Sequence, residues 1–516
     1  MTTTNAGRPI QKILVANRGE IAFRVMRTCR EMGIRSVAVY SDADRSALHV
    51  RAAYQAVRIG PAPSAESYLR PEAILKAAKE TGADAIHPGF GFLSENAAFV
   101  REVRAAGLIF VGPSAEAMEA MGDKIEARRR MIAAGVPVVP GTSDPAESDE
   151  QLIEEARDIG YPVMIKASAG GGGKGIRIVR EEGELLSLAK RASSEAATAF
   201  GNGAIYIEKF LEEPRHIEVQ VFGDSHGNVV HLGERECSIQ RRHQKVIEER
   251  PSVIVDDDLR AAMGASAVRA AKSIGYEGAG TLEFLVDKHK KHYMLEMNTR
   301  LQVEHPITEM TSGIDLVRWQ ILVAQGEPLP LAQDQIELQG HSIECRIYAE
   351  DADNGFLPAT GRVDRLEMPS GPGVRVDSAL YDGMEVGLYY DPMLAKVSVH
   401  GADREEAMGR MARALTEVTI TGVTTNLPFL RRVLASDPFR SGRYDTSTIE
   451  SQPELFAPKL SERRERSVAM MAGLMAHVLR RRRGFVDRNG GSPSAEAPRS
   501  GSRGSWVDAF RPGGDS

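Results

Sequence analysis

The chain has 516 residues, of which 42% are hydrophobic and 26% are charged, and its formal net charge at pH 7 is −6. This length predicts several domains around large cores, and the negative charge argues against a general nucleic-acid-binding role. The three cysteines, Cys29, Cys237 and Cys345, lack metal-ligand spacing and indicate reduced thiols in the cytoplasm. We expect no signal peptide and no membrane span, because no apolar run approaches the ~20 residues that cross a bilayer.

The N-terminal pattern alternates strands with helices. Residues 12–16, 19–32 and 36–40 are typical of strand, helix and strand, and apolar runs at 84–87 and 108–111 continue the series. This alternation predicts a doubly wound, parallel, Rossmann-like sheet. The first turn nevertheless lacks the glycine fingerprint of dinucleotide-binding folds.

A glycine-rich loop follows at residues 169–175, between strand-like runs at 163–168 and 176–180. Consecutive glycines let backbone N–H groups converge on phosphate oxygens and let a loop close as a lid. The loop is not a Walker A motif, because Lys174 is followed by glycine rather than Ser or Thr. We interpret it as a phosphate-binding loop, supported by the adjacent Lys166; a flexible hairpin tip is the alternative.

Further along the chain, polar side chains alternate with mostly apolar ones in residues 296–304. If this run is one extended strand, its charged and amide side chains share a face, because residues two apart in a strand point the same way. The five residues are Glu296, Asn298, Arg300, Gln302 and Glu304. A half-exposed strand with a solvated face is the ordinary alternative.

A partner strand for this run carries another carboxylate. Residues 280–286 form an apolar run interrupted by Glu283, and the polar stretch 287–292 separates the two runs. Symmetric pairing about that stretch places Glu283 directly opposite Glu296. Like charges opposed across a hairpin destabilise it unless a cation lies between them. Since Mg²⁺ takes one or two carboxylates together with substrate phosphates, we predict a Mg²⁺–nucleotide site here, with Asn298 able to supply another oxygen.

Seven ordered motifs together resemble biotin carboxylase, an ATP-grasp enzyme that is the ATP-consuming component of biotin-dependent acyl-CoA carboxylases. They lie at residues 16–22, 87–96, 121–124, 166 with the glycine loop, 236–245, 296–304 and 344–347. The resemblance extends from about residue 10 to about residue 450. One departure is Phe90, where this family commonly has Tyr.

The resemblance implies a multidomain α/β and α+β fold. It places an N-terminal Rossmann-like domain at 10–120, and linker helices with a small ATP-grasp lid at 121–211. Residues 212–455 would hold the ATP-grasp catalytic core and a mixed α+β C-terminal domain with an antiparallel sheet. We predict that the basic tail, 456–516, is disordered, because its composition buries too little apolar surface; a basic helix on a membrane surface is the alternative.

The resemblance also implies the nucleotide and metal sites. Mg²⁺ or Mn²⁺ would be bound by Glu283, Glu296 and Asn298, in agreement with the hairpin argument. The implied ATP-binding residues are Lys124, Lys166, Gly171, Gly172, Gly173, Glu208, Lys209, Leu211, His216, Gln240, His243, Glu283 and Glu296.

The implied chemistry joins bicarbonate to biotin. Lys245, Arg300, Gln302 and the Val303 backbone would bind bicarbonate, and Glu304 would deprotonate it for attack on the γ-phosphate of ATP, giving carboxyphosphate. Arg346 would stabilise the biotin enolate, with Phe90 and Gly91 also contacting biotin. The implied catalytic residues are therefore Glu304, Arg346, Lys245 and Arg300. For Arg346 the alternative is a surface ion pair with Glu344.

Partners follow from the same resemblance. No Ala-Met-Lys-Met biotinylation motif occurs in the chain, so we expect biotin on a separate biotin carboxyl carrier protein, and a carboxyltransferase subunit elsewhere. We also expect a homodimer acting in acetyl-CoA carboxylation and fatty-acid synthesis. The alternatives are another ATP-grasp ligase, such as one that uses an amine, and a catalytically silent scaffold.

Overall fold

The computed structural model describes residues 9–142, 144–146, 148–167, 176–200, 203–242 and 244–457, together with 470, 471, 473–475 and 477. Residues 1–457 belong to one compact unit and residues 458–516 to a second. In the second unit the six described residues are helical. Phe456 and Ala457, the first two residues of the predicted disordered tail, belong to the first unit, and Phe456 is buried in its core, so the prediction is wrong for Phe456. The rest of the predicted tail lies outside the described residues. Among the described residues no helix is both long and apolar enough to cross a membrane.

The N-terminal region contains a five-stranded parallel sheet in the order β3-β2-β1-β4-β5, which confirms the predicted doubly wound layout. Its strands are β1 (Lys12–Val15), β2 (Arg35–Ser41), β3 (Gln55–Gly60), β4 (Ala85–His87) and β5 (Ile109–Phe110). The helices of this region are α1 (Gly19–Glu31), α2 (Leu48–Ala52), α3 (Pro71–Thr81) and α4 (Ala97–Ala105).

A small three-stranded antiparallel sheet, ordered β7-β6-β8, follows three helices. Its elements are α5 (Ala115–Gly122), α6 (Lys124–Ala133), α7 (Asp149–Ile159), β6 (Val163–Ala167), β7 (Arg177–Val179), α8 (Glu182–Phe200) and β8 (Ile205–Lys209). The strands predicted beside the glycine loop are confirmed, while residues 168–175 lie outside the described residues.

The largest element is an eight-stranded sheet in the order β13-β12-β9-β10-β11-β14-β21-β19, in which every pairing is antiparallel. Its strands are β9 (Arg215–Gly223), β10 (Val229–Arg241), β11 (Gln244–Arg250), β12 (Gly278–Val286), β13 (His292–Asn298), β14 (His341–Tyr348), β19 (Val374–Ser378) and β21 (Met393–Gly401). This sheet confirms the predicted antiparallel C-terminal architecture.

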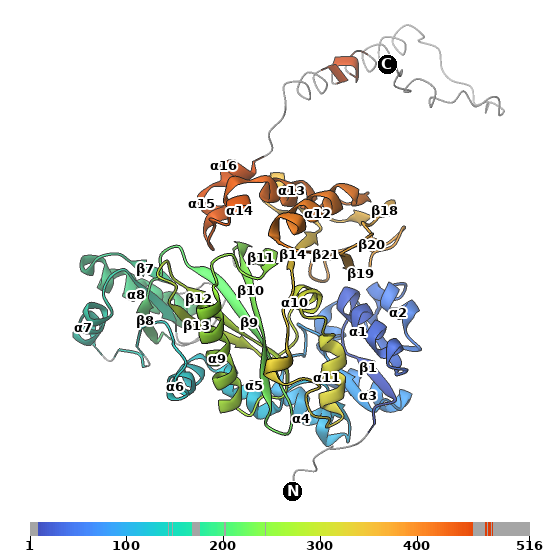
Figure 1. The fold of residues 1–516 in the computed structure, drawn as a ribbon, viewed down its shortest axis with the longest axis horizontal. Helices are drawn as coiled ribbons and strands as arrows, with labels where there is room; N and C mark the ends of the chain where they lie inside the picture. Colours follow the sequence, from blue (N-terminus) through green and yellow to red (C-terminus); the bar gives the residue numbers. More distant parts are fainter. Residues whose placement is uncertain are drawn as a thin grey trace, which may run out of the picture. The chain divides into compact units, whose positions relative to one another are not determined.

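Different helices pack against different parts of this sheet (Figure 1). Helix α9 (Asp257–Ser273) packs on β9 and β10, and α10 (His305–Ser312) packs on β10, β11, β14 and β21. Helices α12 (Arg404–Glu417) and α13 (Leu427–Ala435) lie beside β14. The remaining α-helices and strands are α11 (Leu316–Ala324), β15 (Glu350–Asp351), β16 (Leu357–Pro358), β17 (Gly361–Arg362), β18 (Arg365–Glu367), β20 (Glu385–Val386), β22 (Thr419–Thr421), α14 (Asp437–Ser441), α15 (Thr448–Ser451) and α16 (Pro453–Phe456).

Strand alternation separates an apolar from a polar face on β9. Ile217, Val219 and Val221 are buried in the core that includes α9 residues. Side chains two apart share a face, so His216 and Glu218 point to the opposite side. The apolar side chains of β9 therefore pack in the core, while its polar side chains are available for a site.

The predicted hairpin register is confirmed. In the β12–β13 pair, Glu283 lies directly opposite Glu296, and Thr281 lies opposite Asn298. The register shifts by one residue next to this pair, where Phe284 faces Met294. The two carboxylate-bearing residues therefore meet as the sequence predicted, beside a β-bulge.

The prediction of one extended strand through residue 304 is wrong. Strand β13 ends at Asn298, and Glu304 is the N-cap residue of α10. Pro306 at the start of α10 favours a helix there, because its fixed φ suits the first helical turn. Leu301 and Gln302 are both buried, so exposed and buried side chains do not alternate in this segment. The five polar residues thus do not share one strand face.

Candidate active site

Lys245, near the start of β11, is the centre of the candidate site. Its Nζ donates hydrogen bonds to Glu304 Oε1 at 2.7 Å, Glu218 Oε2 at 2.6 Å and Glu283 Oε1 at 2.9 Å. Burial alone would lower the pKa of Lys245, but the three carboxylates outweigh it and hold this pKa well above its usual value. Lys245 is therefore a permanent cation that joins β9, β12 and the start of α10.

Glu304 is fully buried between two cations. Its Oε2 lies 2.9 Å from Arg346 Nη2, and its Oε1 accepts from Lys245. Burial would raise the pKa of Glu304, but Lys245, Arg346 and Arg235 outweigh it and hold the pKa well below its usual range. Glu304 is consequently ionised at neutral pH, as the predicted base must be.

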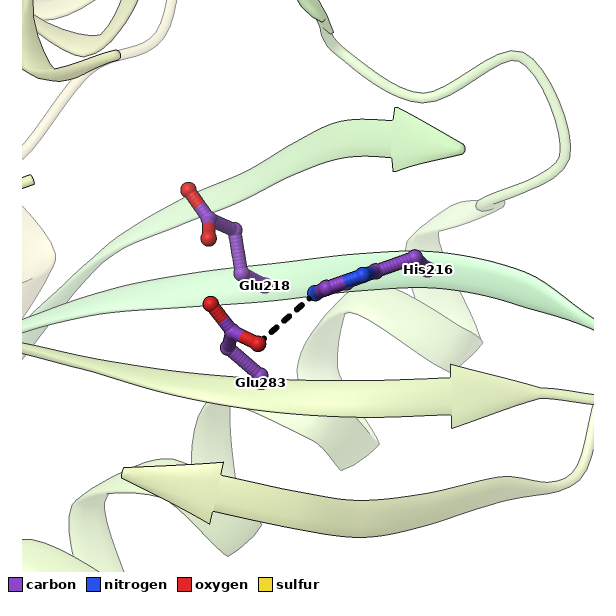
Figure 2. Close-up of side chains that lie close together, drawn as sticks. All are labelled: His216, Glu218 and Glu283. Carbon is purple, nitrogen blue, oxygen red and sulfur yellow. Dashed lines mark ion pairs between the residues drawn. The ribbon is translucent and has the colours of Figure 1, made fainter. Parts of the chain in front are cut away.

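Glu283 lies in a second cluster that Figure 2 shows, with Glu218 and His216 from the neighbouring strand. Its Oε2 is 3.0 Å from His216 Nε2, and its Oε1 accepts from Asn298 Nδ2 at 2.9 Å. Burial would lower the pKa of His216, but the Glu283 charge raises it above its usual value. His216 thus contributes positive charge beside a buried carboxylate.

These carboxylates can hold a divalent cation. Ligand atoms of His216, Glu218 and Glu283 all lie within 4.8 Å of one another. Hard oxygen donors suit Mg²⁺ or Mn²⁺, and Glu283 offers them next to the opposed, exposed Glu296. The Oδ1 of Asn298 accepts from Arg300 Nη2 at 2.9 Å, so it points away from Glu283 in this arrangement. The donor set fits the predicted metal, with Glu218 as an additional nearby carboxylate.

Arg300 is held in a polar network rather than on a strand. Its Nε donates to Glu95 Oε2 at 2.8 Å, and its Nη1 donates to Gln302 Oε1 at 2.9 Å. The Nε2 of Gln302 is buried and has no hydrogen-bond partner among the described residues. A buried amide donor without a partner is costly, which favours an oxygen-bearing ligand at this position.

Arg346 and the Val303 backbone complete the predicted bicarbonate and biotin side. Arg346 is buried on β14 and lies 2.5 Å from Glu248 Oε1, so it is not a surface residue paired with Glu344. The Val303 carbonyl accepts a 2.7 Å hydrogen bond from the fully buried Lys396. This bond fixes the peptide that leads into Glu304.

Phe90 and Gly91 belong to a loop after β4. The loop is anchored by Asn17, whose Nδ2 donates to the carbonyls of Pro88 and Phe90, each at 2.7 Å. Phe90 packs against the N-terminal core, and Gly91 has the left-handed φ of +68°. The structure therefore fixes this loop's backbone at the N-terminal domain.

Several of the predicted nucleotide residues have structural partners. Lys166 donates a hydrogen bond to Glu208, which also lies 3.3 Å from Arg128. Lys209 Nζ donates to the carbonyls of Gly160 and Tyr161, each at 2.9 Å. The half-buried Leu211 follows β8, and Gln240 lies opposite Lys245 in the β10–β11 pair. The side chain of Lys124, Gly171, Gly172, Gly173 and His243 lie outside the described residues.

Sequence reasoning missed Glu218, although a signal for it existed. His216, Glu218 and Gln220 alternate with apolar residues on β9, which is the pattern that identified Glu296 and Asn298. The buried Arg235, whose Nε lies 2.5 Å from Glu218 Oε1, was also missed.

Comparison with known proteins identifies the family. The model "Biotin carboxylase, N-terminal domain" matches residues 9–118, and "Biotin carboxylase C-terminal domain" matches 344–451. Between them, "Carbamoyl-phosphate synthase L chain, ATP binding domain" matches 123–332. A biotin carboxylase of Nostoc sp. is 53% identical over 439 residues, covering 85% of this chain and 98% of the relative. The chain belongs to the biotin carboxylase family. As a biotin carboxylase it is an ATP-dependent ligase with an ATP-grasp domain.

Other relatives extend the comparison. The mitochondrial methylcrotonoyl-CoA carboxylase subunit alpha of Rattus norvegicus is 50% identical over 91% of this chain and 66% of its own length. Among solved structures, the biotin carboxylase domain dimer of Hydrogenobacter thermophilus 2-oxoglutarate carboxylase has a TM-score of 0.81 and 47% identity. The match covers 88% of this chain and all of that one, which was solved with MgADP, ADP and bicarbonate. These matches confirm the biotin carboxylase fold.

Proposed function

We propose that this biotin carboxylase uses ATP and bicarbonate to carboxylate biotin borne by a biotin carboxyl carrier protein, through carboxyphosphate. The observation that carries the proposal is the Lys245 ammonium, which contacts Glu304 and Glu283 within 3 Å. One cation thus links the proposed base to the proposed metal ligand. The bicarbonate and MgADP in the Hydrogenobacter thermophilus structure support the same pairing of substrates.

The metal end of the site would bind the nucleotide phosphates. Mg²⁺ or Mn²⁺ held by Glu283 and Glu296, with Asn298 beside them, would neutralise phosphate charge during transfer. Lys124, Lys166 and the glycine loop at residues 171–173 would bind the phosphates from the small module. Glu208, Lys209, Leu211, His216, Gln240 and His243 would complete the nucleotide site.

The bicarbonate end would be formed by Lys245, Arg300, Gln302 and the Val303 backbone. The buried Gln302 Nε2 supports this assignment, because bicarbonate oxygens would give it an acceptor. Bound bicarbonate would also compete with Glu304 for Lys245, and losing that contact raises the basicity of Glu304. Glu304 would then take the bicarbonate proton as the oxygen attacks the γ-phosphate.

The biotin end would be formed by Arg346, with Phe90 and Gly91. Arg346 is a cation at every working pH, since its pKa is raised by Glu248, Tyr348 and Glu304 against the lowering effect of burial. It lies 2.9 Å from Glu304. A guanidinium fixed beside the base would stabilise the enolate of biotin close to where CO₂ is released.

The assembly around this chain is also a proposal. We propose a homodimer, supported by the dimeric Hydrogenobacter thermophilus relative, that works with a carboxyltransferase in the cytoplasm. The three free, buried cysteines agree with a reducing compartment. We propose acetyl-CoA as the acceptor, serving fatty-acid synthesis. We further propose that the carboxyltransferase selects the acceptor, since the relatives include a methylcrotonoyl-CoA carboxylase subunit.

The test measures phosphate release from Mg·ATP and bicarbonate, with and without free biotin. Bicarbonate-dependent release that biotin stimulates is expected. Release stimulated by an amine instead would support a different ATP-grasp ligase. No release under either condition would contradict the proposal and favour a scaffold. Adding purified candidate carboxyltransferases with acetyl-CoA, propionyl-CoA or methylcrotonoyl-CoA then tests the acceptor separately.

A further inference from the structure

Behind Arg346 lie two buried glutamates that the proposed reaction does not use. Glu248 on β11 and Glu344 on β14 are directly opposed in the antiparallel register, and both side chains are fully buried. Residues opposed in this way point to the same side of a sheet. Two like charges there repel each other and lose their hydration, so ionising both at once is strongly unfavourable.

The neighbouring cations are already engaged by other carboxylates. Arg346 Nη2 lies 2.5 Å from Glu248 but also 2.9 Å from Glu304. Lys396, which faces Arg346 across the β14–β21 pair, lies 3.4 Å from Glu20 and 3.8 Å from Asp377. Positive charge at this position is therefore insufficient for two further carboxylates.

The carboxylate oxygens of Glu248 and Glu344 also have too few hydrogen-bond donors around them. Ser398 Oγ donates to Glu344 Oε2 at 2.7 Å. Glu344 Oε1 and both Glu248 oxygens are buried and accept no hydrogen bond from any described residue, apart from the ion pair to Arg346. A proton on one carboxyl group would give the pair a donor and remove one of the two charges.

We infer that Glu248 and Glu344 hold one proton between them and act as positioning residues, keeping a single negative charge behind the Arg346 guanidinium. The inference rests on the proposed function for the role of Arg346, but the shared proton stands on the register and the burial alone. The two glutamates perform this role together, and neither performs it alone.

The raised pKa values of the two glutamates agree with one shared proton near neutral pH. Burial raises the pKa of Glu248 to about 8, against a lowering effect of Arg346, and burial raises the pKa of Glu344 to about 7, against Lys396. Between these two values the pair holds one proton and carries one negative charge. The charged and ionisable groups facing the pair are Arg346, Tyr348, Lys396, Glu304 and Cys237. Through the proposed cycle, Glu304 gains and loses a proton, while the single charge behind Arg346 stays constant.

The shared proton is tested by thermal unfolding of Glu248→Gln, Glu344→Gln and the double variant at pH 6 and pH 9. A raised pKa in the folded protein stabilises it at low pH, and this contribution is lost as pH rises through the folded value. Each single variant has one carboxyl group left, which can ionise beside Arg346 without a like-charged neighbour. The difference in Tm between the variant and wild type should therefore be more positive at pH 9 than at pH 6, by a few degrees. The control is Asp315→Asn, because Arg24 and Thr28 outweigh burial and lower the pKa of the Asp315 carboxyl, which is ionised at both pH values. The difference in Tm between this variant and wild type should therefore be the same at pH 6 and pH 9.

The positioning role is tested by biotin-dependent phosphate release from the same variants. Either single variant retains one carboxylate, and its rate of phosphate release should stay within about threefold of wild type. The loss of this activity in the double variant should be at least about tenfold larger than the product of the losses in the two single variants. The ATP KM should not change. Equal Tm differences at pH 6 and pH 9 would overturn the shared proton, and additive activity losses would overturn the joint role. If wild type itself released no phosphate, the proposed function would fail, while the Tm result would still decide whether the proton is shared.

Discussion

The ammonium of Lys396 on β21 donates a 2.7 Å hydrogen bond to the main-chain carbonyl of Val303. Both Lys396 and the start of α10 lie in the interior, and the ammonium also lies 3.4 Å from Glu20 at the N-terminus of α1. One buried cation thus connects the N-terminal domain, the C-terminal sheet and the peptide next to Glu304. The Val303 peptide owes its orientation to a residue 93 positions away in the sequence.

Lys396→Met should lower the free energy of unfolding by about 3 kcal/mol, because it leaves buried carboxylates without their partner. Chemical denaturation measures the loss, and adding Glu20→Gln to the variant should restore part of it. In the activity assay, the double variant should show a raised bicarbonate KM with little change in the ATP KM. Equal stability of Lys396→Met and wild type would contradict this account of the contact.

Glu304→Gln should reduce bicarbonate-dependent phosphate release by about 10²-fold or more, since an amide cannot accept the bicarbonate proton. The amide keeps the size of the side chain, so ATP binding, measured by calorimetry, should remain close to wild type. Wild-type carboxylation by this variant would show that another group is the base.

Glu296→Ala should raise the Mg²⁺ concentration needed for half-maximal activity at least about tenfold, because one carboxylate ligand is lost. Leu295→Ala is the matched control, since Leu295 is the exposed neighbour on the same strand. An unchanged Mg²⁺ requirement in Glu296→Ala would contradict the proposed metal pair.

Glu249 predicts part of the acid sensitivity of the fold. Burial would raise its pKa, but His341 at 2.8 Å and Arg404 at 2.7 Å lower it to about 2. A lowered folded pKa stabilises the protein above the unfolded value and loses that contribution as pH falls toward the folded value. Glu249→Gln should therefore cost about 3 kcal/mol at pH 7. The difference from wild type in urea denaturation should shrink as pH falls from about 4.5 toward 2; a difference independent of pH would refute this account.

Local patterns in the sequence predicted the elements well. The strands and helix at the start of the parallel sheet, and the opposition of Glu283 and Glu296, depend on alternation and on a short hairpin. The strand predicted from the same alternation ends at Asn298, because Leu301 is buried and Pro306 lies in the first turn of a helix. A period of two in the sequence does not show where the strand stops.

Contacts between distant strands were harder to predict. Arg346 pairs with Glu248, nearly a hundred residues earlier, rather than with the neighbouring Glu344 that sequence proximity suggested. The partnership depends on β11 and β14 lying side by side, and that order is a property of the whole sheet. Glu218 could have been found from its own alternating pattern, but its contact with Lys245 could not.

The single eight-stranded sheet has a mechanical consequence. Lys245 lies on β11 and Arg346 on β14, and these strands are hydrogen-bonded neighbours, about 4.8 Å apart. The separation between the proposed bicarbonate and biotin ends is therefore set by the large sheet and does not depend on the position of the small three-stranded module. A reactive intermediate formed at one end would meet its acceptor at a fixed distance, wherever that module lies.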